Sequence, residues 1–141
     1  MDKIQTHPEV AVGTFILNKN GELLLVESYK WPGVYSCPGG KIELGESIAQ
    51  TAVREAKEET GLDIKFRQVI NMQEAVYPKG FIVKRHFIFI DALCTTKSMN
   101  VKLEKRELQN YVWVRPKAAL KLKLNTYTRK AINDILKRKK L

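Results

Sequence analysis

Residues 47–60 predict one helix whose two faces differ in chemistry, and this helix constrains the fold more than any other segment. Ser47 and Gln50 match a capping box at its start, and Gly61 stands where a left-handed residue can end it. One face is expected to pack closely on a β-sheet because its side chains are small, namely those of Ala49, Ala52, Val53, Ala56 and Thr60.

The other face of this helix carries three glutamates. Glu55, Glu58 and Glu59 stand at i, i+3 and i+4, so their carboxylates share one surface and repel one another. A cation should offset that repulsion, either Arg54 at i−4 from Glu58 or a hard divalent ion such as Mg²⁺, which prefers oxygen ligands. Taken alone, the helix favours a solvated acidic face whose glutamates pair with Arg54, Lys57 and surface lysines.

The segment before the helix shifts the interpretation toward a binding site. Pro38, Gly39 and Gly40 allow the backbone to approach other groups closely, with its carbonyls turned inward. Glu46 stands at the junction of loop and helix, eight residues before Arg54. An ion pair between these two residues would fix the loop against the helix.

From Gly40 to Leu62 the sequence resembles the motif of the Nudix hydrolases. That motif is a Gly, five residues, a Glu, seven residues, Arg-Glu, an aliphatic residue, any residue, Glu-Glu, any residue, Gly and an aliphatic residue. The chain matches every spacing, with the small Ala56 as the one departure, through Gly40, Glu46, Arg54, Glu55, Ala56, Glu58, Glu59, Gly61 and Leu62. So many constrained positions make the resemblance specific.

The resemblance implies a metal site. In Nudix enzymes the glutamates that match Glu55, Glu58 and Glu59 bind the metal, usually with the backbone carbonyl of the residue that matches Gly39. The implied cofactor is Mg²⁺, with Mn²⁺ as a possible substitute. The implied reaction is metal-assisted hydrolysis, in which an activated water attacks phosphorus in line. In some members Glu58 or Glu59 itself would be the general base.

Other motif residues would support the metal ligands. The Arg that matches Arg54 orients the glutamates in Nudix enzymes and counts here among the expected catalytic residues. The Glu that matches Glu46 pairs with this Arg, and Gly40 and Gly61 are expected to have structural roles. A displaced supporting residue still weakens metal binding.

A second candidate for the general base lies outside the motif. In some Nudix enzymes a loop glutamate serves as base or as an extra metal ligand, and the loop expected at 95–110 offers Glu104 and Glu107. We prefer Glu107, which is nearer the strand predicted to follow. An exposed acid paired with Arg106 or Lys105 explains Glu107 equally well.

The motif specifies diphosphate chemistry rather than the group attached to it. Residues 38–46 look like the MutT-type enzymes, which convert nucleoside triphosphates, including oxidised ones, to monophosphate and pyrophosphate. Pro78, however, lies sixteen residues past Leu62, and a proline at this spacing is associated with ADP-ribose pyrophosphatases. We expect a MutT-like substrate, with ADP-ribose, an RNA 5′ end and non-catalytic nucleotide binding as alternatives.

Three residues outside the acidic face are expected to bind the substrate, namely Trp31, Lys41 and Tyr77. Trp31 and Tyr77 lie in predicted loops and could stack on a base. Tyr77, like Phe81, could instead be a sheet residue, which would leave Trp31 as the free aromatic ring.

The other segments predict a mixed α/β fold, and the resemblance implies an α/β/α sandwich with a central mixed sheet in one domain over residues 1–141. Strands are expected at residues 10–17, 23–26, 81–94 and 111–115. Another long strand is predicted by alternating apolar residues that would share one face: Ile64, Phe66, Ile70, Met72 and Val76.

Two further helices are expected near the C-terminus. Pro116 suits the first turn of a short helix at 116–120. A longer helix starting near Asn125 would face the core with Tyr127, Ala131, Ile135 and Leu136.

The positive charge is concentrated near the C-terminus. The chain carries +10, and residues 115–141 hold ten Lys or Arg against one acid, so this segment accounts for +9. Such a segment could attract RNA, but a solvated helix is the favoured interpretation. A small nucleotide is therefore the expected partner, and the protein is expected to be a monomer or homodimer.

Cysteine content and hydropathy restrict the class of protein further. Cys37 and Cys94 are too few for a disulfide framework or a zinc site, so both are expected to be reduced packing residues. No apolar run suits a membrane span and residues 1–9 lack the pattern of a signal peptide. A cytoplasmic protein without membrane contact is expected.

Overall fold

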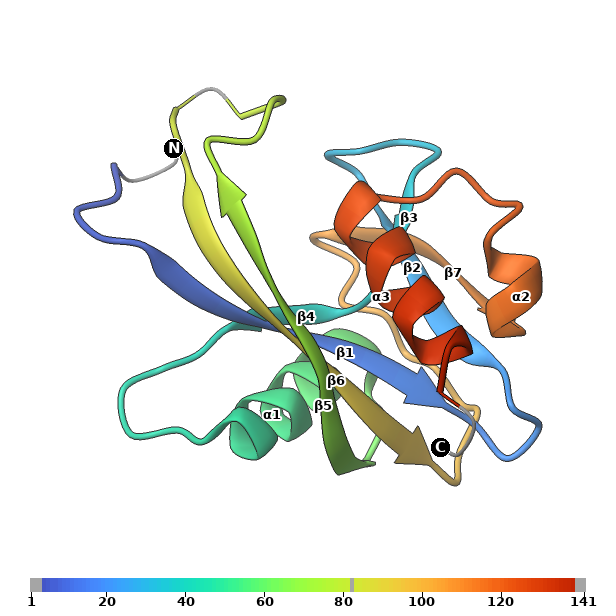
Figure 1. Ribbon diagram of the computed structural model, residues 1–141. Coiled ribbons are helices and arrows are strands. Elements are labelled where there is room, and N and C mark those ends of the chain that lie inside the picture. Colours follow the sequence, from blue (N-terminus) through green and yellow to red (C-terminus); the bar gives the residue numbers. More distant parts are fainter. Residues whose placement is uncertain (1–3, 82, 139–141) are drawn as a thin grey trace.

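The computed structural model describes residues 4–81 and 83–138, within which seven strands form one mixed sheet (Figure 1). In chain order the elements are β1 (Glu9–Leu17), β2 (Leu23–Ser28), β3 (Tyr35–Ser36), β4 (Gly39–Lys41), α1 (Ile48–Thr60), β5 (Ile64–Val76), β6 (His86–Thr96), β7 (Leu108–Val114), α2 (Pro116–Ala119) and α3 (Thr126–Leu136). The main path of the sheet is β3-β2-β1-β6-β5, with β4 paired to β1 and β7 paired to β2. β1 and β6 are parallel, and the other pairs are antiparallel.

Helices cover both faces of this sheet. In Figure 1, α1 and α3 lie on opposite sides of β1. Alternate side chains of β1 point to opposite faces, so Val12 and Ile16 pack in an apolar cluster with α1, while Phe15 and Leu17 pack in another with α3. This α/β/α arrangement around a mixed sheet confirms the predicted fold class. None of the helices in the described residues has the length and apolar character needed to cross a membrane.

α1 begins and ends where the sequence predicts. Ser47 and Gln50 form the reciprocal capping box, and Gly61 ends the helix in the left-handed conformation at φ 72°. The small residues Ala52, Ala56 and Thr60 are buried against the sheet. Val53 was expected on this face but is 42% exposed, because the buried stripe instead passes through Thr51.

The prediction that one face of the long strand β5 is apolar throughout is wrong. Met72 and Val76 are 64% and 55% exposed, whereas Ile70 and Ala75 are buried. The pairing with β6 is irregular between Phe66 and Gln68 and again between Val69 and Asn71. Each β-bulge adds a residue to one strand and shifts the alternation of faces, which a strict period of two cannot anticipate.

The boundaries of two other strands also differ from the prediction. β6 begins at His86 rather than at residue 81, because the backbone N–H of Tyr77 donates to Arg85 O at 2.8 Å and closes a loop. β7 begins at Leu108 rather than at 111, because its pairing with β2 extends to Ser28. The short strands β3 and β4 were not predicted, since each depends on pairing with a distant strand.

α3 packs on the sheet largely as predicted. Ala131 and Ile135 are buried, and Ile132 is buried beside them. Leu136, which was expected to face the core, is 42% exposed at the last position of the helix. The Asn125 side chain caps the start by accepting hydrogen bonds from the N–H groups of Tyr127 and Thr128.

Removing the cap of α1 should destabilise the protein measurably. We expect Ser47→Ala to lower the free energy of unfolding by about 1 kcal/mol, because the Gln50 N–H then loses its acceptor. Ser47→Thr, which keeps a capping oxygen, should retain most of the stability. Urea denaturation of both variants checks this, and equal stability of Ser47→Ala and the parent protein would contradict it.

Candidate functional site

Arg54 connects the loop before α1 to the carboxylates on the helix. Its guanidinium donates to both oxygens of Glu46, from Nε at 2.6 Å and from NH2 at 2.9 Å. Its NH1 group donates to Glu55 at 2.7 Å and to Glu58 at 3.3 Å, and NH2 also donates to Lys41 O at 3.0 Å. The Arg54 hydrogen bonds hold the pKa of Glu46 down at about 2. The predicted ion pair between Glu46 and Arg54 is therefore present.

Glu59 is the most enclosed carboxylate of the three. Its Oε1 accepts a hydrogen bond from the Gly39 N–H at 2.7 Å. Burial and, to a lesser extent, the negative charges of Glu55, Glu107 and Glu58 raise the pKa of Glu59 to about 8, against the effect of that hydrogen bond. Burial also raises the pKa of Glu55, although Arg54 opposes this. Such a site disfavours a bare negative charge and would gain from a cation.

Two adjacent glycines allow the backbone of β4 to reach this cluster. A Cβ atom on Gly40 would lie 2.3–2.5 Å from the carboxyl atoms of Glu55, so any larger residue would displace that side chain. A Cβ atom on Gly39 would lie 2.2 Å from Val12 O of the paired strand β1. Position 39 therefore requires glycine, because a side chain there would meet backbone, whereas a larger residue at position 40 would require the Glu55 carboxylate to move.

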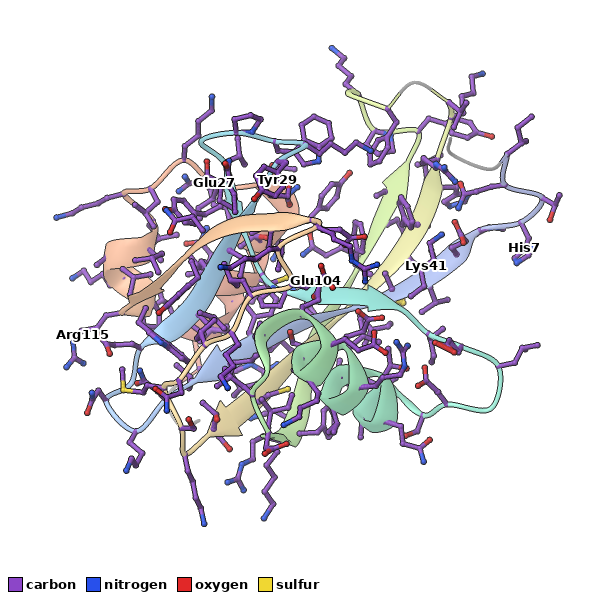
Figure 2. All side chains as sticks on the ribbon, turned by 180° about the vertical axis from the view of Figure 1, so that it is seen from behind. His7, Glu27, Tyr29, Lys41, Glu104 and Arg115 are labelled. Atoms are coloured by element: carbon purple, nitrogen blue, oxygen red, sulfur yellow. The ribbon has the colours of Figure 1, made fainter. Side chains whose placement is uncertain are left out.

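The acidic side chains line a cavity of about 670 Å³. Its walls include Glu55, Glu58 and Glu59 of α1, Gly39 to Lys41 of β4, and Glu104 and Glu107 of the loop before β7. Figure 2 shows Glu104 beside α1, on the side of the molecule that also carries Lys41. We call this space the acidic cavity.

The two loop glutamates differ in their partners. Glu104 accepts hydrogen bonds from the Arg106 guanidinium at 3.0 and 3.1 Å, and these lower its pKa. Glu107 makes no side-chain hydrogen bond or ion pair within the described residues, yet its charge raises the pKa values of Glu55 and Glu59. Arg106 thus pairs with Glu104, and the charge of Glu107 also raises the pKa of Arg106.

The donor set of the acidic cavity fits a hard divalent cation in chemistry. Glu55, Glu58 and Glu59 each offer one carboxylate oxygen to Arg54 or Gly39, and the other oxygen makes no hydrogen bond within residues 4–81 and 83–138. Oxygen ligands of this kind suit Mg²⁺ or Mn²⁺. Across those same residues, however, no three acidic, His or Cys side chains are already gathered at metal-binding distances. A cation would therefore have to draw the carboxylates together.

Two more cavities, together called the apolar part of the cleft, adjoin the acidic cavity. Gly39 and Gly40 also line a second cavity of about 210 Å³, together with Phe89, Asp91 and Tyr127. This cavity shares Ser36, Phe89, Asn125 and Tyr127 with a third one of about 420 Å³. Each space shares lining residues with the next, so the three adjoin in a series, with carboxylates at one end and aromatic rings at the other.

Five aromatic rings follow one another along the apolar part of the cleft. Successive ring centroids lie 5.1–6.1 Å apart in the order Trp31, Phe81, Phe87, Phe89 and Tyr127. These are contact distances for aromatic pairs. The rings come from two loops, β6 and α3, so only the folded chain assembles them.

The expected substrate-binding residues lie in different surroundings. Trp31 lines the third cavity. Lys41 lines the acidic cavity, but its Nζ pairs at 2.8 Å with Glu9, which is not among the lining residues of that cavity. Tyr77 is 57% exposed, and its ring lies near His86 and Lys84 rather than among the cavity-lining residues.

Sequence reasoning did not identify Asp91, Phe89 or Asn125 as lining residues. One available signal was Asp91 itself, a single acid inside the apolar strand segment from Phe87 to Cys94. Cys37 also lines the second cavity, and burial raises the pKa of its thiol. It is a free, half-buried cysteine, in agreement with the predicted packing role.

Comparisons with known proteins agree with the fold and the motif. A family model described as the NUDIX domain matches residues 7–135. The chain is 34% identical over 90 residues to an ADP-ribose pyrophosphatase from Methanocaldococcus jannaschii, covering 61% of this chain and 53% of that protein. It is 28% identical over 108 residues to the nucleoside triphosphatase NudI from Escherichia coli, covering 72% and 76% of the two chains.

A solved structure extends this similarity to the whole fold. The MutT protein from Methanosarcina mazei Go1 superposes with a TM-score of 0.80 at 24% identity, covering 98% of this chain and 100% of that one. The chain spans 23%, 38% and 53% of the lengths of the first curated relatives it matches. Because the family model covers most of the sequence and the predicted motif lies within it, this chain belongs to the Nudix domain family.

Proposed function

We propose that this protein is a metal-dependent hydrolase that cleaves the diphosphate linkage of a nucleotide-like substrate. The proposal rests on the cleft, because Gly39 and Gly40 line both the acidic cavity and the second cavity, which contains aromatic rings. A divalent cation and a diphosphate suit the acidic end, where three glutamates of α1 line one cavity. A flat, apolar base suits the aromatic end.

The proposed cofactor is Mg²⁺, with Mn²⁺ as a possible substitute. When bound, the metal would neutralise charge on the diphosphate and lower the pKa of a water molecule. Glu55, Glu58 and Glu59, with the carbonyl of Gly39, are the proposed ligands. Arg54 is a positioning residue, because one guanidinium contacts both Glu55 and Glu58 while Glu46 holds it in place.

Glu107 is our first candidate for the general base. It lines the acidic cavity and keeps its carboxylate without an ion pair among the described residues, whereas Glu104 is engaged by Arg106. Glu58 and Glu59 are the alternatives, since one of them could accept the proton while the other carboxylates remain on the metal.

We propose nucleoside triphosphates, oxidised ones included, as the substrate, with monophosphate and pyrophosphate as products. The similarity to NudI, whose name gives a nucleoside triphosphatase, supports this choice. ADP-ribose is the alternative. It is supported by the similarity to the ADP-ribose pyrophosphatase from Methanocaldococcus jannaschii and by the position of Pro78, which lines the third cavity. Product analysis with both substrates distinguishes the two.

An RNA 5′ end remains a less favoured substrate. Several C-terminal cations have contacts within the fold: Arg129 donates to Leu120 O and Leu122 O, Arg138 donates to Ile70 O, and Lys130 pairs with Asp134. RNA binding would be salt-dependent and would disappear when residues 137–140 are deleted, of which 139 and 140 lie outside the described residues. The cytoplasmic location, the single-domain organisation and the monomeric or dimeric state stay predictions.

Removing one proposed metal ligand should abolish turnover without unfolding the protein. We expect Glu58→Gln to lower kcat by about 100-fold or more with Mg²⁺, since a neutral amide is a poor ligand for a hard cation. Glu74→Gln, an exposed change on β5, is the matched control. Phosphate release and unfolding curves provide the readouts. Normal activity of Glu58→Gln would show that the ligand assignment is wrong, and no hydrolysis by the parent protein would favour a non-catalytic binding module.

Metal affinity should depend on pH through Glu59. Because the pKa of Glu59 lies near 8 in the metal-free protein, the proton and the cation compete for this carboxylate at lower pH. We expect the apparent Mg²⁺ affinity to fall by up to about tenfold per unit as pH decreases below 8. Calorimetric titrations between pH 6 and 8.5 measure this. The Glu59→Gln protein should lose the steep dependence, and a flat profile for the parent protein would refute the prediction.

A further inference from the structure

Asp91 is a buried acid inside the apolar part of the cleft. It lies on β6, is 4% exposed, and lines the second cavity between the carboxylates and the aromatic rings. Its Oδ2 atom accepts a hydrogen bond from Gln73 Nε2 at 2.8 Å. Its Oδ1 atom has no hydrogen-bond partner within the described residues. One carboxylate oxygen is thus available to whatever occupies the cavity.

The surrounding residues leave space for this oxygen. A Cβ atom on Gly13 would lie 2.8 Å from Asp91 Oδ1 and 3.0 Å from Cys37 Sγ, so glycine at this position keeps the carboxylate uncrowded. Gln73 is itself fixed, because its amide also donates to Tyr127 O at 2.9 Å. The Oδ2 atom of Asp91 is therefore fixed by its hydrogen bond from Gln73, whereas Oδ1 remains available for a hydrogen bond.

A purely structural role accounts poorly for this arrangement. Burial raises the pKa of Asp91 to about 6, so the charged form is unfavourable in the folded protein. A single neutral hydrogen bond from Gln73 does not compensate a buried carboxylate fully. A group with N–H donors that entered the cavity would satisfy Oδ1 and offset this penalty.

We propose that Asp91 determines base specificity by accepting hydrogen bonds from a nucleobase that presents adjacent N–H donors, as guanine does through N1–H and its 2-amino group. The inference rests on the proposed function, since it assumes that the base enters the apolar end of the cleft. Asp91 would be a specificity-determining residue and would take no part in the chemistry at phosphorus.

The other common bases fit this acceptor less well. In adenine and cytosine the amino group lies next to an unprotonated ring nitrogen, which would face the carboxylate with its lone pair. In uracil the single N–H lies between two carbonyl oxygens. Asn125 lines the same cavity, and because its Oδ1 accepts two backbone N–H groups, its amide NH₂ can donate to a base carbonyl. A donor from Asn125 and an acceptor from Asp91 together complement the guanine edge.

The test compares GTP with ATP, which share the same triphosphate. We expect the parent protein to have a kcat/KM for GTP at least about tenfold above that for ATP, because a charged acceptor is matched by two donors. Asp91→Asn should lower kcat/KM for GTP by about tenfold or more and leave that for ATP nearly unchanged. Asp63→Asn, an exposed aspartate that pairs with Lys57, is the matched control. A GTP-to-ATP ratio that is near one in the parent protein, or unchanged by Asp91→Asn, would overturn the inference while leaving the proposed function intact.

A binding experiment separates this inference from the proposed hydrolysis. GMP and AMP carry the bases without a diphosphate, so calorimetry with each monophosphate measures base recognition without turnover. We expect GMP to bind the parent protein more tightly than AMP and to lose this advantage in Asp91→Asn. Equal binding of GMP and AMP to the parent protein would contradict the role of Asp91. This comparison can be made without any variant.

The stability of the variant provides a further readout. At pH 8 the Asp91 carboxylate is charged although its pKa is raised, so Asp91→Asn should unfold at a higher urea concentration than the parent protein. An aspartate with only a structural role would instead make the variant less stable, and all substrates would be affected alike.

Discussion

The bidentate contact between Arg54 and Glu46 is the interaction on which the rest of the site depends. Glu46 ends the loop that follows β4, and Arg54 lies two turns into α1, so this contact fixes the glycine-rich segment against the helix. The same guanidinium contacts Glu55 and Glu58, which lets one cation both orient the acidic side chains and reduce their repulsion. A planar, permanently charged group is needed for this, because a lysine ammonium cannot present the same fork of donors. Arg54 therefore fixes the positions of the Glu55 and Glu58 side chains on α1.

The cleft separates two kinds of recognition along one path. At the acidic cavity, buried carboxylates favour a divalent cation and the phosphates that accompany it. Beyond Gly39 and Gly40, rings such as Phe89 and Tyr127 favour a flat apolar group, while Asp91 places one acceptor among them. Gly39 and Gly40 line both the acidic cavity and the second cavity, so the two ends lie next to each other. Chemistry and specificity can therefore reside in different residues of the same fold.

Local sequence signals predicted α1 and its site well. The cap at Ser47, the end at Gly61 and the pairing of Glu46 with Arg54 all follow from short-range spacing, so the motif could be interpreted without the fold. The two bulges of β5 and the exposure of Met72 could not be predicted, because they depend on the pairing with β6. The apolar end of the cleft was missed for the same reason. Its residues come from β1 to β4, β6, α3 and the loops between them, and nothing in the local pattern around Asp91 indicates that they meet.

A crystal structure with Mn²⁺ and a non-hydrolysable nucleoside triphosphate would test the central claim most directly. The anomalous signal of Mn²⁺ would locate the cation independently of the surrounding density. Our account predicts a peak in contact with oxygens of Glu55, Glu58 and Glu59, with the phosphates on the cation and the base between the aromatic rings. A cation bound elsewhere, with these three carboxylates facing solvent and the nucleotide outside the cleft, would contradict it.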